Sequence, residues 1–266
     1  MIYIHGIQAF SDNYIWCLFN DNGQAIIIDP GCAEPVECFL AENNLTLEAI
    51  LITHHHPDHI GGVRQLKEKY APKIFGYEGA AFDFLDYELS DSQIFKVLNL
   101  EFTVIEVPGH TLDHIAFYTE VSATNSQGNT TLQPSLFCGD TLFSAGCGRL
   151  FEGTAEQMFD SLNKFAKLPS NTLIYCAHEY TLNNLAFAKT LMPNNEALSA
   201  YISHCEEKRH KGQSTIPTIL STELEINPFL RHDDPEIYHN LKSRGLITNR
   251  NSQEIFRAVR KAKDSY

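Results

Sequence analysis

The chain has 266 residues, of which 43% are hydrophobic and 20% are charged, and its formal net charge is −13. This length predicts one large domain or two of ordinary size, and the balanced composition excludes a disordered, collagen-like or repeat-dominated protein. The acidic charge disfavours nucleic acid and anionic lipid as partners, and no segment approaches the roughly 20 consecutive apolar residues of a transmembrane helix.

Short apolar runs with turn signals between them predict a β-rich first part of the chain. Residues 14–19 and 24–28 flank Asp21-Asn22-Gly23, which is a strong hairpin turn signal. Helical spacing of apolar residues appears at 35–43 and 63–70. Further strands are predicted at 49–53, 102–107, 114–119, 135–138 and 172–176, and the polar stretch 122–134 is predicted to be a loop.

After about residue 177 the pattern becomes helical. Helices are predicted at 182–192, 196–211, 217–224 and 251–263. Asn251 can cap the last helix, and Glu254 occupies the capping-box position. Strands mixed with helices, followed by helices alone, predict an α/β domain over residues 1–175 and a smaller helical domain over 176–266.

The strongest chemical signal is a run of histidines that follows the predicted strand 49–53. His54, His56 and Asp58 alternate, so an extended segment would direct them to one side, and His59 follows as the chain turns. Imidazole and carboxylate ligands together suit zinc, iron or manganese. His55 would point the other way, and we read it as a non-ligand.

Three further candidate ligands each follow a predicted strand. They are His110 in Pro-Gly-His-Thr, Asp140 in Cys-Gly-Asp-Thr and His178 in Cys-Ala-His-Glu. The remaining histidines, at positions 5, 114, 204, 210, 232 and 239, lack this context, and we expect them to be surface or packing residues.

The number of candidate ligands indicates how many metal ions the site could hold. Seven candidates exceed the three or four ligands of one zinc ion, whereas two ions that share a carboxylate would use them all. Such a pair can hold a hydroxide that is a nucleophile at neutral pH. The residues therefore predict metal-assisted hydrolysis, and no GxSxG motif competes with this interpretation.

The chain resembles the metallo-β-lactamase superfamily through these motifs and, within it, the hydroxyacylglutathione hydrolase (glyoxalase II) family. The stretches that carry the narrower resemblance are 138–143, 146–149, 151–154, 177–181, 227–231 and 260–264. The resemblance implies an αββα sandwich of metallo-β-lactamase type with a smaller C-terminal all-helical domain that binds glutathione. It also implies hydrolysis of S-D-lactoylglutathione to D-lactate and glutathione, the second step of methylglyoxal detoxification.

The resemblance also assigns roles to residues. His54, His56 and His110 would hold one metal ion, and Asp58, His59 and His178 would hold the other, with Asp140 bridging. Asp58 and Asp140 would be the catalytic residues, Asp58 as a proton shuttle, and Asp29 would orient the metal loop. The glutathione part would contact Arg149, Phe151, Tyr180, Arg260 and Lys263.

Two of these positions depart from some family members. Phe151 stands where some members carry Tyr, so one hydroxyl is missing, and Arg149 stands where some carry Lys. A local cluster of cations fits the two carboxylates of glutathione: residues 242–263 hold seven Lys or Arg and one acidic residue, Glu254. Arg260 and Lys263 are three residues apart and share one face of the last predicted helix.

Three alternatives share the metal motif: an iron-dependent glutathione persulfide dioxygenase, a nuclease, and a protein whose zinc ions only hold the fold. The acidic charge disfavours the nuclease, and ligands at strand ends favour an open site over a structural one. We expect two divalent ions, zinc first and iron or manganese otherwise, and a monomer that binds neither nucleic acid nor membrane. The seven cysteines contain no CxxC pair and residues 1–20 no basic leader, so we expect a cytoplasmic protein without a disulfide framework.

Overall fold

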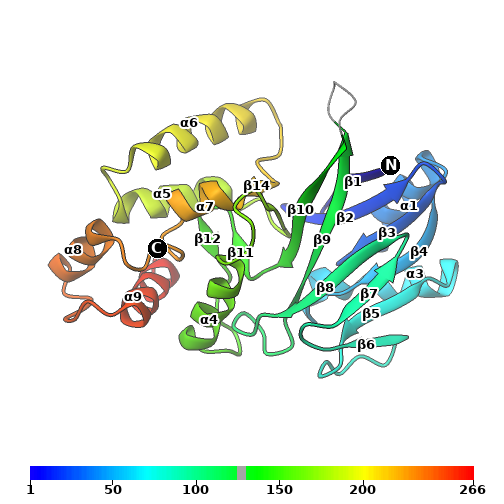
Figure 1. Cartoon of the computed structure of the whole chain (residues 1–266), viewed down its shortest axis with the longest axis horizontal. Coiled ribbons are helices and arrows are strands. Elements are labelled where there is room, and N and C mark those ends of the chain that lie inside the picture. The colour runs from blue at the N-terminus through cyan, green and yellow to red at the C-terminus, as the bar shows by residue number, and fades with distance from the viewer. Residues whose placement is uncertain (125–129) are drawn as a thin grey trace. The chain divides into compact units, whose positions relative to one another are not determined.

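The computed structural model describes residues 1–124 and 130–266, and Figure 1 shows the path of the chain. The chain forms two compact units. Unit 1 comprises Met1–Glu106 and Asp113–Gly139, and unit 2 comprises Val107–Leu112 and Asp140–Tyr266. The short segment of unit 2 before residue 113 is tied there by hydrogen bonds from Gly153 N to Gly109 O (3.1 Å) and from Ser161 Oγ to Pro108 O (2.8 Å). This division by compactness differs from the predicted boundary after residue 175, which follows the change from mixed to helical pattern.

Unit 1 is built on a sheet with the strand order β1-β2-β3-β4-β5-β6. Its strands are β1 (Ile2–Ala9), β2 (Asn13–Asn20), β3 (Gln24–Ile28), β4 (Thr46–Leu51), β5 (Lys73–Tyr77) and β6 (Tyr87–Leu89). The first three pair antiparallel, and β3 to β6 pair parallel. The predicted strands 14–19 and 24–28 and the turn between them are confirmed, whereas β1 was not predicted.

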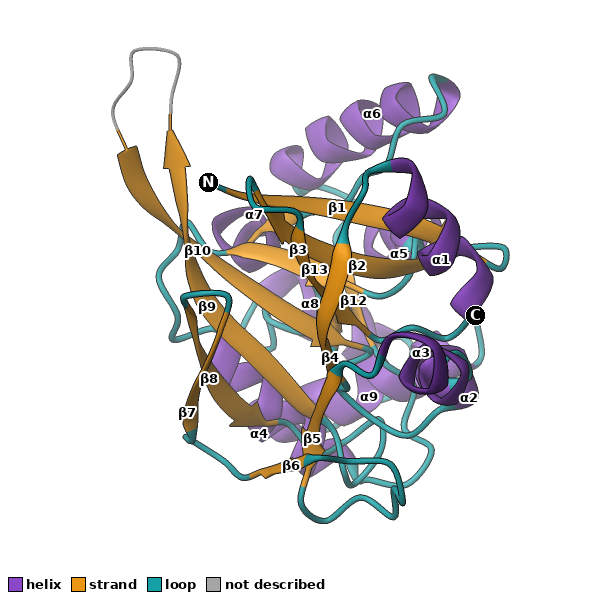
Figure 2. Cartoon of the chain, turned by 90° about the vertical axis from the view of Figure 1, so that its right-hand side faces the viewer, coloured by secondary structure: helices purple, strands orange, loops and turns teal. Residues whose placement is uncertain are grey.

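Helices α1 (Ala33–Glu42) and α3 (Val63–Tyr70) cover one face of this sheet, and the short α2 (Pro57–Ile60) lies between them in sequence (Figure 2). The core on this face is formed by alternate strand residues and by helix residues at helical spacing. Examples are Ala25 and Ile27 on β3, Val36 on α1 and Leu66 on α3, all fully buried. The predicted helices 35–43 and 63–70 are confirmed.

Four further strands of unit 1 form an antiparallel meander: β7 (Ile94–Val97), β8 (Leu100–Glu106), β9 (Ile115–Thr124) and β10 (Thr130–Gly139). Aromatic rings join this meander to the first sheet, since Phe95 on β7 stacks on Phe75 of β5 at 5.0 Å and on Phe102 of β8 at 5.3 Å. The predicted loop 122–134 is wrong at both ends, because residues 122–124 and 130–134 pair as strands. Its middle lies outside the described residues.

Unit 2 is mainly helical. Its helices are α4 (Ala155–Phe165), α5 (Thr181–Leu191), α6 (Glu196–His210), α7 (Leu220–Ile226), α8 (Pro235–Ser243) and α9 (Ser252–Asp264). Its strands are the hairpin β11 (Leu142–Phe143) and β12 (Gly146–Cys147) and the antiparallel pair β13 (Leu173–Cys176) and β14 (Thr218–Ile219). No helix in the described part of the chain is long and apolar enough to cross a membrane.

The predicted helices of the last third agree with α5, α6 and α9. The Asn251 side chain caps α9 by accepting hydrogen bonds from the backbone N–H groups of Gln253 (3.0 Å) and Glu254 (3.1 Å). The predicted helix 217–224 starts too early, because Thr218 pairs in β14 with Ile174 of β13, and the helix begins only at Leu220. The seven cysteines are all free, as expected.

Candidate metal centre and substrate pocket

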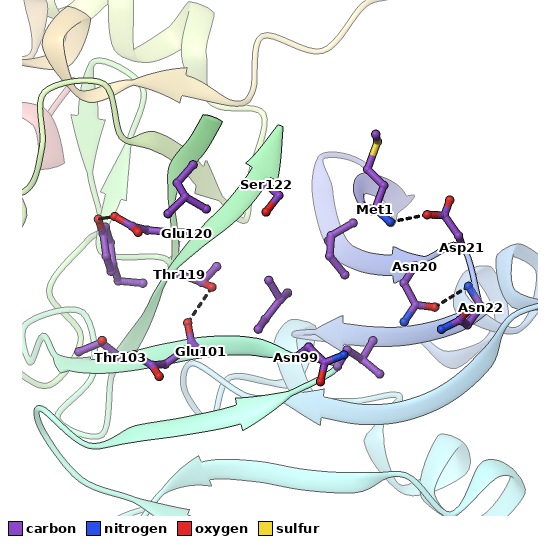
Figure 3. Close-up of a pocket in the computed structure, with 15 residues that line it drawn as sticks. Met1, Asn20, Asp21, Asn22, Asn99, Glu101, Thr103, Thr119, Glu120 and Ser122 are labelled. Carbon is purple, nitrogen blue, oxygen red and sulfur yellow. Dashed lines mark hydrogen bonds and ion pairs between the residues drawn. The ribbon is translucent and has the colours of Figure 1, made fainter. Parts of the chain in front are cut away.

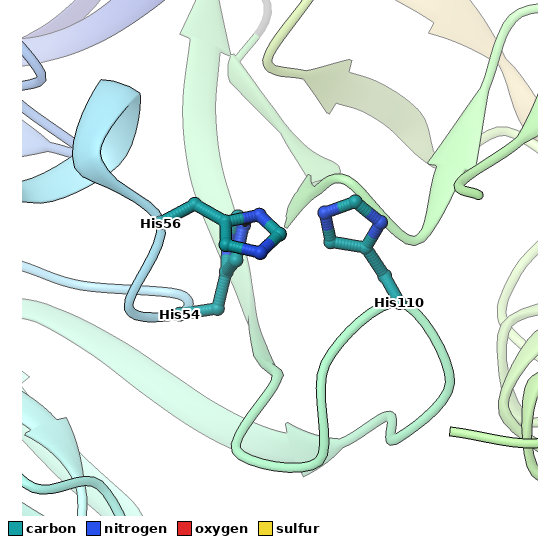
Figure 4. Close-up of side chains that lie close together, drawn as sticks. All are labelled: His54, His56 and His110. Carbon is teal, nitrogen blue, oxygen red and sulfur yellow. Dashed lines mark hydrogen bonds between the residues drawn. The ribbon is translucent and has the colours of Figure 1, made fainter. Parts of the chain in front are cut away.

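The histidine loop of unit 1 follows β4, and His54 and His56 project from it (Figure 4). His54 Nε2 lies 3.1 Å from His56 Nδ1, and the rings of His54 and His59 are 4.1 Å apart between centroids. His54 and His59 are each only 1% exposed. The extended run ends at His56, because Pro57 begins α2, so Asp58 and His59 lie on the first turn of a helix rather than on an extended segment.

Asp29 anchors this loop from the end of β3. Its Oδ2 lies 3.0 Å from His59 Nδ1, and its carboxylate accepts hydrogen bonds from Thr53 N (2.8 Å) and Thr53 Oγ1 (2.7 Å). Asp29 is buried and has a left-handed backbone with φ of 53°, a conformation that Asp tolerates better than most residues. The hydrogen bond on Nδ1 leaves Nε2 of His59 as the nitrogen that can bind a metal ion.

The other neighbours of the loop are polar or aromatic. Asn13 Nδ2 donates to Asp58 Oδ2 at 3.0 Å, and His55 Nδ1 lies 2.9 Å from Asp113 Oδ1. His114 is buried and stacks on His54, with ring centroids 4.5 Å apart and planes 16° apart. His114 is therefore a packing residue, as predicted, but one that packs against a candidate ligand.

Within unit 1, Gly139 packs against Thr53 and against the ring of His114, which stacks on His54. Its φ is 48°, and a Cβ atom at this position would lie 2.5 Å from Thr53 Oγ1 and 2.8 Å from a carbon of the His114 ring. Any larger residue would displace the histidine stack. This explains why glycine precedes Asp140 in the chain.

In unit 2, Asp140 lies between two histidines. Its Oδ1 is 3.3 Å from His178 Nε2, and its Oδ2 is 3.4 Å from His110 Nε2. All three side chains are buried. A carboxylate whose two oxygens face different imidazoles has the arrangement needed to bridge two metal ions.

Neighbouring groups fix the two imidazoles. His110 Nδ1 lies 2.7 Å from the carbonyl oxygen of Arg149, which directs Nε2 of His110 toward Asp140. The Tyr180 ring stacks on His178 at 4.6 Å with planes 7° apart. Phe151 packs edge-on against His110 at 5.3 Å and is 61% exposed.

A cavity of about 320 Å³ opens beside Asp140 and His110, and it lies entirely within unit 2. It is lined by His110, Asp140, Phe143, Cys147, Arg149, Phe151, Tyr180, Asn183, Asn184, Arg260 and Lys263. All five predicted glutathione-contacting residues are among them. The cavity therefore combines two candidate metal ligands with three cationic side chains, in the size range of small-molecule sites.

The cations of the cavity differ in their surroundings. Arg260 is 6% exposed and donates to Cys147 O (2.9 Å) and Gly148 O (3.3 Å), and its Nη2 lies 2.8 Å from Asp264 Oδ1. Lys263 is half-buried, with Nζ 3.3 Å from Asn183 Oδ1. Burial, helped by the nearby Arg260 charge, lowers the pKa of Lys263 to about 8. Burial also raises the pKa of the Cys147 thiol to about 11, so this thiol stays protonated at neutral pH.

A second cavity, of about 740 Å³, lies in unit 1 (Figure 3). Its described lining contains neither histidine nor cysteine, and two of its acidic groups are paired with nearby cations. The amino group of Met1 contacts Asp21, and Lys96 Nζ lies 3.2 Å from Glu101 Oε2. Although it is larger, this cavity lacks the imidazole ligands that the sequence predicts for the active site.

Several residues around the candidate site were not singled out from the sequence. They are Asn13, Asn183, Asn184, Glu223 and Asn227. Each acts through a hydrogen bond to a residue far away in the chain, so spacing along the sequence gives no signal for it. Only the stretch 227–231, as part of the family resemblance, pointed to one of them.

The donors in both units are imidazole nitrogens and carboxylate oxygens, a set that suits zinc, iron or manganese. His54, His56, Asp58 and His59 belong to unit 1, whereas His110, Asp140 and His178 belong to unit 2. Within each unit the donor atoms turn toward one another, and hydrogen bonds from Asp29 and from the Arg149 carbonyl orient two of the rings. These residues fit a metal site.

Comparisons with known proteins agree with this chemistry. Residues 13–178 match the family described as "Metallo-beta-lactamase superfamily", and residues 179–266 match "Hydroxyacylglutathione hydrolase C-terminus". A hydroxyacylglutathione hydrolase of Pseudoalteromonas translucida (strain TAC 125) is 46% identical over 270 residues, which cover 100% of both chains. One of Serratia proteamaculans (strain 568) is 46% identical over 262 residues, which cover 98% of both.

Solved structures show the same fold. ETHE1 from Myxococcus xanthus matches with a TM-score of 0.63 and 25% identity, covering 93% of this chain and 92% of that one. The BLEG-1 B3 metallo-beta-lactamase matches with a TM-score of 0.61 and 22% identity, covering 86% of this chain and 99% of that one. The superfamily fold and the histidine and aspartate donors together indicate a dinuclear metal site.

The full-length relatives favour the hydrolase over the persulfide dioxygenase alternative, because their names and the C-terminal match both specify hydroxyacylglutathione hydrolysis. The expected α/β fold of metallo-β-lactamase type with a helical C-terminal region is confirmed. The chain therefore belongs to the hydroxyacylglutathione hydrolase (glyoxalase II) family of the metallo-β-lactamase superfamily, and it is a thioester hydrolase.

Proposed function

We propose that the protein hydrolyses S-(2-hydroxyacyl)glutathione thioesters, with S-D-lactoylglutathione as the representative substrate, in the second step of methylglyoxal detoxification. The reaction replaces the C–S bond of the thioester with a C–O bond from water. It releases a 2-hydroxy acid, here D-lactate, and glutathione as its thiolate. The relatives' shared name supports this substrate class.

One observation carries the proposal: the unit 2 cavity joins candidate metal ligands to a cluster of cations. Asp140 and His110 lie at one part of its wall, and Arg149, Arg260 and Lys263 supply positive charge at another. Glutathione carries two carboxylates, so an enzyme with a net charge of −13 needs local cations to bind it. The cations would hold the glutathione part, and the thioester carbonyl would then lie near the metal ions held by Asp140 and His110.

His54, His56 and His110 would hold one metal ion, and Asp58, His59 and His178 the other, with Asp140 bridging them. The ions would supply an activated water molecule and stabilise negative charge on the carbonyl oxygen. The geometry within each unit supports this assignment, because the oxygens of Asp140 face two imidazoles and Asp29 fixes the ring of His59. Zinc is the first choice of metal, with iron or manganese as alternatives.

The reaction requires little acid–base catalysis from the protein side chains. Thiolate is a good leaving group, because a free thiol has a pKa of about 8.5, so little general-acid help is required. Asp58, which accepts a hydrogen bond from Asn13, would carry the proton that water loses. Arg149, Phe151, Tyr180, Arg260 and Lys263 would bind and orient the glutathione part.

The proposed roles divide along the chain. Residues 1–175 would form the metal-binding catalytic domain, and residues 176–266 the glutathione-binding helical domain. We further propose a cytoplasmic monomer that binds neither nucleic acid nor membrane. The seven free cysteines and the acidic charge support a reducing compartment and a small-molecule substrate.

The test is loss of the thioester absorbance of S-D-lactoylglutathione on addition of the purified protein, with released thiol measured in the same samples. We expect one equivalent of thiol and one of D-lactate per thioester consumed, and no activity after treatment with a chelator. An oxygen electrode with glutathione persulfide provides the comparison. Oxygen uptake there, without thioester hydrolysis, would reject the proposal.

A further inference from the structure

The side chain of Glu223, on α7, is fully buried in unit 2 and accepts four hydrogen bonds. Its Oε1 accepts from Ser144 Oγ at 3.0 Å and from Thr218 Oγ1 at 2.8 Å. Its Oε2 accepts from Ala145 N at 2.8 Å and from Asn227 Nδ2 at 2.9 Å. Burial raises the pKa of this carboxyl, and the four donors oppose that rise. A buried carboxylate with this many partners holds its neighbours firmly, because losing any partner leaves a polar group unsatisfied.

Ser144 and Ala145 belong to the β11–β12 hairpin, which lies beside α7 (Figure 1). Two asparagines also hydrogen-bond this hairpin. Asn227 Nδ2 also donates to the carbonyl oxygens of Phe143 (3.1 Å) and Gly146 (3.0 Å). Asn184 Nδ2, from α5, donates to Ser144 O at 3.1 Å. Side chains that come later in the chain therefore bind the backbone of this hairpin on both of its strands.

The hairpin needs this support because its turn is intrinsically poor. Ser144 and Ala145 form the two-residue connection, and neither is among the Asn and Gly residues that such turns prefer. Ala145 has a φ of 54°, a left-handed conformation that is unfavourable for alanine because of its Cβ atom. Gly146 lies against Asn184, since a Cβ atom there would be 2.5 Å from Asn184 Nδ2. The turn's conformation is thus set by its contacts rather than by its own sequence.

The hairpin in turn forms a wall of the substrate cavity. Phe143 and Cys147 line that cavity, and the carbonyl oxygens of Cys147 and Gly148 accept the hydrogen bonds that hold Arg260. A change in the hairpin would therefore move both a wall of the cavity and one of its cations. Glu223 itself does not line the cavity.

We propose that Glu223 and Asn227 are positioning residues for glutathione binding, acting through the β11–β12 hairpin on the cavity wall and on Arg260. This inference rests on the proposed function, since it concerns the same cavity. It assigns to α7, which contributes no residue to the cavity lining, a specific effect on substrate affinity. The side chains of Glu223 and Asn227 hydrogen-bond the hairpin rather than the candidate metal ligands, so we expect the effect on glutathione binding to exceed any effect on metal content.

The test compares Glu223→Gln with Glu225→Gln. Glu225 is exposed on the same helix, so the control makes the same chemical change without touching the hairpin. In Glu223→Gln an amide NH₂ replaces one acceptor and faces hydrogen-bond donors. We expect reduced glutathione, titrated by calorimetry, to bind about tenfold more weakly to Glu223→Gln, with KM raised in parallel. Metal content and kcat should stay within about twofold of the unsubstituted protein, and Glu225→Gln should match that protein throughout.

Ser144→Ala keeps the test decisive if Glu223→Gln does not fold, because it removes a single donor to Glu223 from the hairpin side. We expect about threefold weaker glutathione binding in that variant. Unchanged glutathione affinity in the folded variants, with only a lower Tm, would show a merely structural role and overturn the inference. Failure of the unsubstituted protein to hydrolyse the thioester would instead count against the proposed function, since glutathione binding is measured independently of turnover.

Discussion

Asp29 and His59 are joined by a contact of 3.0 Å between Oδ2 and Nδ1, and both side chains are buried. The same carboxylate accepts two hydrogen bonds from Thr53, at the entrance to the histidine loop. One side chain at the end of β3 therefore fixes both the start of the loop and the ring orientation of a candidate ligand. This relationship predicts that Asp29 affects metal affinity.

Replacing Asp29 with Asn tests that role with little disturbance to the backbone, because Asn also tolerates the left-handed conformation found at this position. We expect Asp29→Asn to bind metal about 10- to 100-fold more weakly, since the amide no longer orients the His59 ring as a carboxylate does. Competition with a chelator, followed by elemental analysis, measures the loss. Asp160→Asn, an exposed position on α4, is the matched control. Equal metal retention in the two variants would contradict this role.

Lys263 gives the protein a predicted pH dependence. Burial lowers its pKa to about 8, so its positive form dominates at pH 7 and is mostly lost at pH 9. If Lys263 binds a glutathione carboxylate, KM should rise by up to about tenfold between these pH values, because only the charged form attracts the anion. Affinity for glutathione is therefore high below the pKa of Lys263 and is lost as the pH rises above it.

The control for this prediction is Lys263→Arg, because the guanidinium stays charged throughout this pH range. We expect its KM to change less than that of the unsubstituted protein between pH 7 and pH 9. Steady-state kinetics with S-D-lactoylglutathione at several pH values measures both. Identical pH profiles of KM for the two proteins would exclude Lys263 as the titrating group.

Much of unit 1 could be predicted because its signals are local. The strand 24–28 contains the continuous apolar run 25–28 after a hairpin turn, and the helix 63–70 has regular apolar spacing. The cluster of histidines after β4 is readable for the same reason: its chemistry lies within six residues. The start of α7 was misplaced because pairing of Thr218 with β13, a partner far away in the chain, overrides the local signal.

The β11–β12 hairpin could not be predicted at all. Its strands have two residues each, and its turn is held by Glu223, Asn227 and Asn184 rather than by turn residues. The difference in surroundings between Arg260 and Lys263 could not be predicted from the sequence either. Both are cations on one helix face, but Arg260 is engaged largely by backbone carbonyls, whereas Lys263 is half-buried with a lowered pKa.

Phe151 offers a gain-of-affinity test. Its ring is 61% exposed over His110 and lines the cavity, but it lacks the hydroxyl that Tyr would add. We expect Phe151→Tyr to lower KM by about two- to tenfold, the equivalent of about 0.5–1.5 kcal/mol for one hydrogen bond. Phe151→Leu, which keeps an apolar side chain but removes the ring, should raise KM. A Tyr variant with unchanged KM would mean that no ligand group reaches this position.

A metal titration of the metal-depleted protein, with hydrolysis of S-D-lactoylglutathione and bound metal measured on the same samples, tests directly whether two metal ions drive the reaction. We expect activity to rise to a plateau as about two ions bind per chain, and Asp140→Ala, which removes the carboxylate proposed to bridge the ions, to reach neither that occupancy nor most of that activity. Full hydrolysis by the metal-depleted protein, or an unimpaired Asp140→Ala variant, would contradict it.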